Sequence, residues 1–238
     1  MVTQIELGGI VLDVVKKDIK NVHLSVHPAD GKVRISAPLR MDTDTIRLFA
    51  ISKLDWIRRQ QQALRAQERE TPREYLDRES HVVWGKRHLL NVIEKESAPQ
   101  VQLEHSTLVL QVRPGSSEEK KQAVLEHWYR QQVRAAASPL IQRWETLIGV
   151  RVERVFVQRM KTKWGSCSPG AGSIRLNSEL AKKPRECLEY ILVHEMTHLL
   201  EPTHNQRFVS LMNQFMPTWT FHRDTLNRLP VRHERWSY

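Results

Sequence analysis

The sequence predicts an α+β protein in which N-terminal strand–helix units precede a helical core with a short β-hairpin or sheet packed on its helices. Two observations lead to this fold class. Short stretches alternate apolar and polar residues, and longer stretches with helical periodicity begin with Ser, Asp or Glu. Of the 238 residues, 40% are hydrophobic and 27% charged, as is typical of folded globular proteins. We expect a β-rich N-terminal region with one long helix over residues 1–115, and the core over residues 116–238.

The first region begins with a predicted hairpin. Val22–Val26 and Lys32–Pro38 alternate like strands, and the intervening HPADG contains the Pro, Asp and Gly of a turn. Asp42–Thr45 then offers capping residues, after which apolar residues recur near helical spacing. The pattern predicts a single long helix that ends before Pro72.

A similar pattern then recurs along the chain. VVWGKRHLLNVIE and LEHSTLVLQVRPG are predicted strands, and the segment from Ser116 to Gly149 is a predicted helix. Both predicted helices carry a tryptophan, Trp56 or Trp128, followed by Arg and Gln. This recurrence favours a duplicated strand–helix unit, although the spacing from proline to tryptophan differs between the two copies.

The pattern changes again after the second long helix. RVERVFVQRM, over residues 151–160, predicts a strand, KTKWGSCSPGAG predicts a loop, and SIRLNSEL predicts a second strand, so we expect a hairpin. Pro184 stands where a first helical turn begins, and the next helix is expected to follow it. Leu188, Leu192 and Met196 form one apolar stripe of that helix. We expect this stripe to face other helices while the opposite side faces the hairpin.

Charge and cysteine content restrict the partners and the compartment. The net charge of +10 makes acidic partners such as nucleic acid plausible, but the basic residues are scattered rather than gathered in a tail. No apolar run approaches the roughly 18 residues that span a bilayer, and the N-terminus does not look like a secretory signal. With only two cysteines, Cys167 and Cys187, a disulfide framework is excluded, and we expect a cytoplasmic protein with free thiols.

The segment HEMTHLLEPTH, from His194 to His204, has the spacing of a metal site. Because residues four apart lie on one helix face, His194 and His198 can direct their imidazoles at one ion. Glu195 lies further round the same helix and is placed to take a proton from water. Neutral nitrogen ligands with one open position suit catalytic zinc, so Zn²⁺ is the expected cofactor.

A third ligand requires a change of chain direction, and Pro202 provides one. Thr203 and Gln206 fit a capping box, which predicts a second helix with His204 in its first turn and with Phe208 as one of its apolar positions. A bend between the helices would bring His204 back toward the pair. The other candidates for this ligand are Glu201, His222 and Asp224.

Two segments together resemble a known family. RMKTKWGSCSPGAGSIRLNSEL, followed by LEYILVHEMTHLLEPTHNQRF, resembles the YgjP-like metal-dependent hydrolases, relatives of the SprT-like zinc metallopeptidases. The resemblance implies a zincin-like (minigluzincin) core, with zinc on His194, His198 and His204 and with Glu195 as the catalytic base. Metzincins have glycine where this chain has Glu201, and gluzincins take their third ligand, a glutamate, from a later helix. The chain therefore resembles neither group completely.

Residues around WGSC have two interpretations. Arg159, Trp164, Arg175 and Asn177 could contact a substrate that pairs with an edge strand, or stabilise an oxyanion. Alternatively, Trp164 covers the end of the core, Gly165 permits the turn, and Asn177 satisfies loop backbone groups. Cys167 and Cys187 are more readily explained as small buried residues than as nucleophiles or metal ligands.

The leading hypothesis is a zinc metallopeptidase in which Glu195 activates a zinc-bound water to cleave an amide bond of a peptide or protein. One alternative is a nucleic-acid-associated protein, whose zinc core acts on DNA-bound proteins or is structural. A second alternative is a folded module with an inactive zinc site. An acidic Glu195 on a largely buried helix argues against an inactive site.

Overall fold

The computed structural model describes residues 2–27, 31–66, 73–161 and 163–230. The described residues form two compact units, unit 1 within residues 2–66 and unit 2 within residues 73–230. The boundary expected after residue 115 thus falls inside the second unit, in the loop before its longest helix. Over the described ranges, no helix is both long and apolar enough to cross a membrane.

Unit 1 contains a four-stranded sheet. Its strands are β1 (Val2–Leu7), β2 (Ile10–Lys17), β3 (His23–Val26) and β4 (Val33–Pro38), in the order β1-β2-β4-β3. The central pair β2–β4 is parallel and the outer pairs are antiparallel. The predicted β3–β4 pairing is confirmed, whereas the β1–β2 hairpin was not predicted. Its two-residue turn is formed by Gly8 and Gly9, both in the left-handed region.

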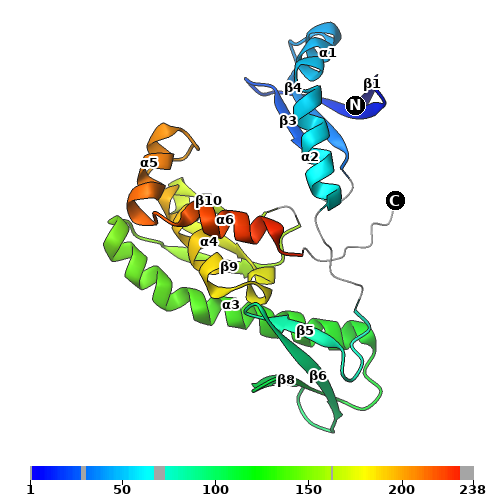
Figure 1. Ribbon diagram of the computed structural model, residues 1–238, viewed down its shortest axis with the longest axis vertical. Coiled ribbons are helices and arrows are strands. Elements are labelled where there is room, and N and C mark those ends of the chain that lie inside the picture. Colours follow the sequence, from blue (N-terminus) through cyan, green and yellow to red (C-terminus); the bar gives the residue numbers. More distant parts are fainter. Residues whose placement is uncertain (1, 28–30, 67–72, 162, 231–238) are drawn as a thin grey trace. The chain divides into compact units, whose positions relative to one another are not determined.

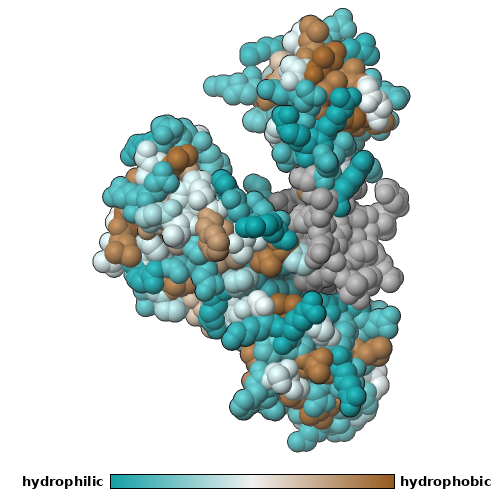
Figure 2. Space-filling view, in the orientation of Figure 1, coloured by the Kyte–Doolittle hydropathy of each residue, from teal (hydrophilic) through white to brown (hydrophobic). Residues whose placement is uncertain are grey.

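Two consecutive helices cover the sheet of unit 1, α1 (Thr43–Ser52) and α2 (Leu54–Ala66), so the prediction of one long helix was wrong. The side chain of Asp42 caps α1 by accepting from the backbone N–H of Thr45 at 2.7 Å. The helix is interrupted at Lys53, whose N–H donates to the carbonyl of Ala50 three residues back. The helix end expected before Pro72 lies outside the described residues. Figure 2 shows hydrophobic surface over α1, where Leu48 is exposed.

Unit 2 begins with a second sheet of the same topology. Its strands are β5 (Ser80–Val83), β6 (Lys86–Glu94), β7 (Gln100–Glu104) and β8 (Thr107–Val112), in the order β5-β6-β8-β7, again with a parallel central pair. Each segment predicted as one strand is therefore a hairpin. Trp84 and Gly85 form the β5–β6 turn with φ of 48° and 77°. The shared strand order agrees with a duplicated unit.

Helix α3 (Glu118–Ile148) joins this sheet to the rest of unit 2, and Figure 1 shows it running along the unit. The predicted helix from Ser116 to Gly149 is confirmed; Gly149 ends it at φ 76°. Residues of α3 such as Val133 and Ala137 are buried in one continuous core with β6, β8 and the later helices.

A three-stranded sheet follows, and here the predicted hairpin was wrong. Strands β9 (Arg154–Gln158), β10 (Gly165–Ser168) and β11 (Ser173–Asn177) lie in the order β10-β11-β9. The two predicted strands, β9 and β11, are parallel, and the hairpin is formed by β10 and β11 instead. The reason is that WGSCS, predicted as loop, contributes an edge strand.

Three further helices complete the unit: α4 (Arg185–Thr197), α5 (Gln206–Phe215) and α6 (Trp219–Arg228), of which α6 was not predicted. A 3-10 turn over Ser178–Lys182 precedes α4. Helix α4 is buried on several sides, because Leu188, Leu192 and Met196 are all inaccessible to solvent while Cys187 and Ile191, on other faces, are also buried. It contacts α3, β10, β11, α5 and α6, which places it at the centre of the unit.

Candidate metal centre

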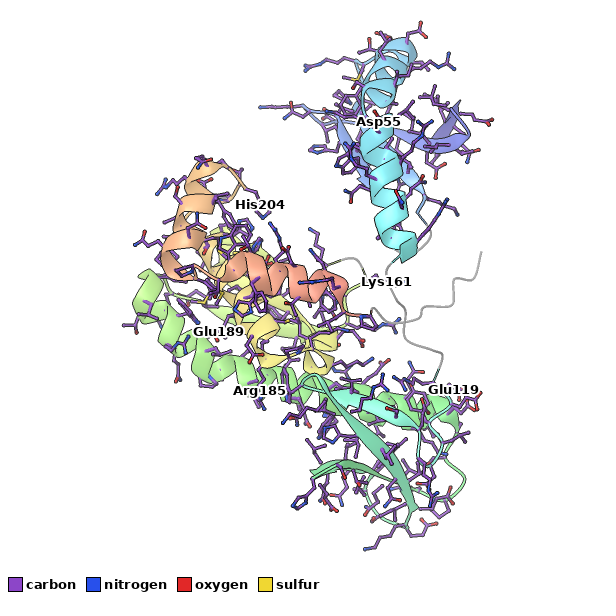
Figure 3. The ribbon with its side chains drawn as sticks, viewed as in Figure 1. Asp55, Glu119, Lys161, Arg185, Glu189 and His204 are labelled. Atoms are coloured by element: carbon purple, nitrogen blue, oxygen red, sulfur yellow. The ribbon has the colours of Figure 1, made fainter. Side chains whose placement is uncertain are left out.

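Three imidazoles meet at the end of α4. The Nε2 atom of His204 lies 3.0 Å from Nε2 of His194 and 3.1 Å from Nε2 of His198. Among the residues that the structure describes, these three histidines are the group of metal-ligating side chains whose donor atoms converge. His194 and His198 come from the last turn and the C-cap of α4, and His204 from the turn before α5 (Figure 3).

The turn that brings His204 back differs in detail from the prediction. Helix α4 ends at Thr197, and the cap of α5 is Asn205, whose side chain accepts from the N–H of Phe208 at 3.0 Å. The predicted Thr203 cap and the placement of His204 in the first helical turn were therefore wrong. Thr203 instead donates to the Glu201 carboxylate through both its N–H and its hydroxyl.

The alternative third ligands all have other contacts. Besides Thr203, the Glu201 carboxylate lies 4.0 Å from the guanidinium of Arg207. The Nε2 atom of His222 is 3.2 Å from the hydroxyl of Thr218, and Asp224 accepts from Arg223. The structure therefore brings His204, and none of these three, to the other two imidazoles.

The donor set suits a divalent ion of the zinc type. Burial, reinforced by the neighbouring imidazoles, lowers the pKa of His194 to about 3, and burial also lowers the pKa of His204. Neutral imidazoles carry the lone pairs that a metal requires. A tetrahedral zinc with bonds of about 2.0–2.1 Å would separate its nitrogens by about 3.3 Å, close to the separations found here. The Nδ1 atom of His198 is 3.0 Å from the carbonyl oxygen of Glu201, so an Nδ1–H donor would leave Nε2 free for an ion.

The side chain of Glu195 extends from α4 toward the edge strand β10. It is only 5% exposed, and burial raises the pKa of its carboxyl to about 7, while Lys163 acts in the opposite direction. A pKa near 7 allows a carboxyl group to accept and return a proton near neutral pH. A Cβ atom at Gly165 would lie 2.7 Å from Oε1 of Glu195, so the strand backbone lies directly against this carboxylate.

Asn177 braces the loop that leads to β10. Its side-chain amide donates to the carbonyls of Met160 and Lys163, both at 2.8 Å, while its oxygen accepts from the N–H of Met160 and of Glu179. These contacts match the backbone-satisfying role that the sequence analysis offered as the alternative to substrate binding.

The other predicted substrate contacts are dispersed. The guanidinium of Arg159 lies 3.8 Å from the Glu126 carboxylate on α3, and the Trp164 ring lies under the ammonium of Lys183 at 5.7 Å. Arg175 is placed by its register on the sheet face opposite Gly165, where its guanidinium lies 5.5 Å from the Phe156 ring centre. The structure therefore does not gather these side chains around the histidines.

The two cysteines are free thiols in the structure. Burial raises the pKa of Cys167 to about 11, with a further contribution from Glu195, and burial raises the pKa of Cys187 to the same value. A thiol that stays protonated at neutral pH is a poor nucleophile. The expectation of small, unreactive cysteines fits these environments.

The sequence did not identify two residues as part of this site. Gly165 was interpreted only as a turn residue, and Phe208 only as an apolar position of the last predicted helix. Phe208 contacts all three imidazoles. Helical spacing identifies such a residue as buried but does not indicate what it is buried against.

Comparisons with known proteins identify the family of the chain. The chain matches the profile of the YgjP-like metallopeptidase domain over residues 20–229. Among solved structures it is similar to the metallopeptidase zymogen of Pyrococcus abyssi abylysin, with 24% identity and a TM-score of 0.35. That match covers 39% of this chain and 97% of the other. No curated protein matches the chain significantly. Because the family match spans most of the sequence, the protein belongs to the family of YgjP-like metallopeptidase domains.

Proposed function

We propose that this protein is a zinc-dependent peptidase that hydrolyses amide bonds, with His194, His198 and His204 as metal ligands and Glu195 as general base. The observation that carries the proposal is the position of the His204 Nε2 atom, 3.0 Å from that of His194 and 3.1 Å from that of His198, at the end of the helix that also carries a buried carboxyl group. A zinc ion held there would supply Lewis acidity, which polarises a carbonyl and lowers the pKa of a coordinated water.

The proton transfers fall to Glu195. Its carboxylate takes the proton from the attacking water and later returns it to the leaving amine. Its burial supports both steps. A carboxyl group with a pKa of about 7 can take up a proton near neutral pH and can also release it. The charge of Lys163 lowers this pKa and so favours the ionised form, which is the form that takes the proton.

Strand β10 is the proposed docking edge for the substrate. One side of β10 pairs with β11, and within the described residues no strand pairs with its other side. An extended peptide can add to such an edge through main-chain hydrogen bonds. A peptide aligned there would pass Glu195, which lies against Gly165 at the start of the strand. We place the catalytic part in the predicted zincin-like core from residue 116 onward.

The test is Glu195→Gln, assayed on a mixture of denatured proteins with cleavage sites read by mass spectrometry. We expect kcat to fall by about 10²–10⁴-fold while one zinc per chain is retained, because the amide keeps the shape but cannot take a proton. The matched control is Glu186→Gln, an exposed acid in the first turn of the same helix. Full activity in Glu195→Gln, or no metal on the wild type, would refute the proposal.

A further inference from the structure

Phe208 is the residue on which the three imidazoles converge from one side. It is the third residue of α5, is 2% exposed, and its backbone N–H is held by the Asn205 cap. The same turn therefore fixes both His204 and the position from which the Phe208 ring projects. This arrangement ties the last candidate ligand to the start of α5.

The Phe208 ring packs against all three imidazoles. The Phe208 centroid lies 4.6 Å from that of His198, with the rings stacked at 29°. It lies 4.9 Å from His194 and 4.8 Å from His204, both in edge-on arrangements. Such aromatic pairs stabilise a fold beyond the effect of their buried area. Movement of any one imidazole would break a contact with this ring.

Hydrogen bonds provide little of the orientation. Metal-binding histidines usually donate their second ring nitrogen to a carbonyl or carboxylate, which fixes the ring plane. Here Nδ1 of His198 has such a partner, the carbonyl of Glu201. Nδ1 of His194 is buried and has no hydrogen-bond partner among the described residues. The His194 ring is instead held edge-on by Phe208 and by Tyr190, whose centroid is 6.0 Å away.

We propose that Phe208 is a positioning residue that pre-organises the metal site. Its ring packing does here what hydrogen bonds from the second ring nitrogen of metal-binding histidines do elsewhere. The proposal rests on the proposed function, since it assumes that the three imidazoles bind a metal. Without the flat ring, His194 in particular gains rotameric freedom, and the metal must then restrict that freedom on binding.

The test compares Phe208→Leu with Phe215→Leu, a matched exchange on the same helix at a half-buried position. The zinc dissociation constant is measured for each folded protein by competition with a chromogenic chelator, and Co²⁺ absorption spectra report the coordination geometry. We expect Phe208→Leu to bind zinc about 10-fold more weakly or worse, with an altered Co²⁺ spectrum. Phe215→Leu should retain the wild-type values.

The outcomes separate this inference from the proposed function. If the wild type binds no zinc, the proposed function fails. If the wild type binds zinc, and folded Phe208→Leu binds it with the same affinity and the same Co²⁺ spectrum, Phe208 has no positioning role and only this inference is overturned. Equal weakening in Phe208→Leu and Phe215→Leu would also overturn it, because a general loss of stability would then explain both.

Discussion

The Glu195 carboxylate is packed against the backbone of Gly165, leaving no room for a side chain at that position. A Cβ atom on Gly165 would meet Oε1 of Glu195 at 2.7 Å and a methyl group of Ile191 at 2.9 Å. The glycine therefore serves a close approach between strand and helix. It lets the edge strand β10 lie directly beside the proposed general base.

This contact predicts that Gly165→Ala impairs catalysis more than metal binding. The added methyl must displace Glu195 or the strand, and misplacement by about 1 Å can cost on the order of 10²-fold in rate. We expect kcat/KM to fall at least 10-fold, with zinc content unchanged. Gly170→Ala is the control, since no atom lies within 4 Å of its added Cβ. Equal activity of the two variants would show that β10 and α4 can move apart to accommodate the methyl group without loss of catalysis.

The buried Glu195 should destabilise the metal-free protein at neutral and alkaline pH. Its pKa is raised from 4.5 to about 7, so the folded state holds this proton more tightly than the unfolded state. Stability therefore falls as pH rises from about 4.5 to 7, by on the order of 3 kcal/mol, and stays lower above pH 7. We compare the unfolding free energy of metal-free Glu195→Gln with that of the metal-free wild type. The variant should be more stable relative to the wild type at pH 8 than at pH 5.

Urea unfolding of the two metal-free proteins at both pH values measures this difference. Glu186→Gln, on the exposed first turn of α4, should show no such pH-dependent gain. If the difference between Glu195→Gln and the wild type is the same at pH 5 and pH 8, the carboxyl group ionises normally, and its suitability for returning a proton near neutral pH is lost.

Asn177 should be a determinant of stability rather than of substrate affinity. It is 4% exposed and its amide makes four hydrogen bonds to the backbone of the loop and of the following turn. Asn177→Ala removes the partner of four part-buried backbone groups, and we expect a loss of roughly 1–3 kcal/mol in unfolding free energy. The exposed Gln158 is its register partner on β9, so Gln158→Ala should cost less than about 0.5 kcal/mol. A change in KM without a change in stability would instead support a substrate contact.

The candidate ligands were predictable because local rules place them. The i, i+4 spacing puts His194 and His198 on one helix face, and Pro202 predicts that the helix stops before His204, as it does at Thr197. What surrounds them depends on tertiary packing. The ring of Phe208 and the missing side chain of Gly165 acquire their roles from elements that meet only in the fold.

The prediction of strand pairing was wrong for a similar reason, because pairing also depends on tertiary contacts. The four residues Gly165–Ser168 have weak strand propensity, so β10 was interpreted as loop, and its insertion makes β9 and β11 parallel. The β5–β6 turn was missed because its first residue, Trp84, is a bulky side chain at φ 48°, where a glycine or asparagine is expected.

That turn yields a last prediction, which concerns how the second four-stranded sheet supports the histidine helix. The N–H of Trp84 donates to the carbonyl of Ala181 at 2.7 Å, and the guanidinium of Arg185 lies 4.5 Å from the Trp84 ring centre. A Cβ on Gly85 would lie 3.2 Å from Cγ of Pro184, at the start of α4. The turn is therefore docked against the helix that carries the candidate ligands.

Gly85→Ala and Gly115→Ala separate docking from backbone strain. Both glycines have left-handed φ, 77° and 69°, so alanine costs about 1 kcal/mol of strain at either position. Only Gly85 also meets a neighbouring side chain, whereas an added Cβ on Gly115 meets nothing within 4 Å. We expect Gly85→Ala to lose at least about 1 kcal/mol more than Gly115→Ala in urea unfolding, because the turn must withdraw from Pro184. Equal losses would mean that the contact between Gly85 and Pro184 does not help to hold α4.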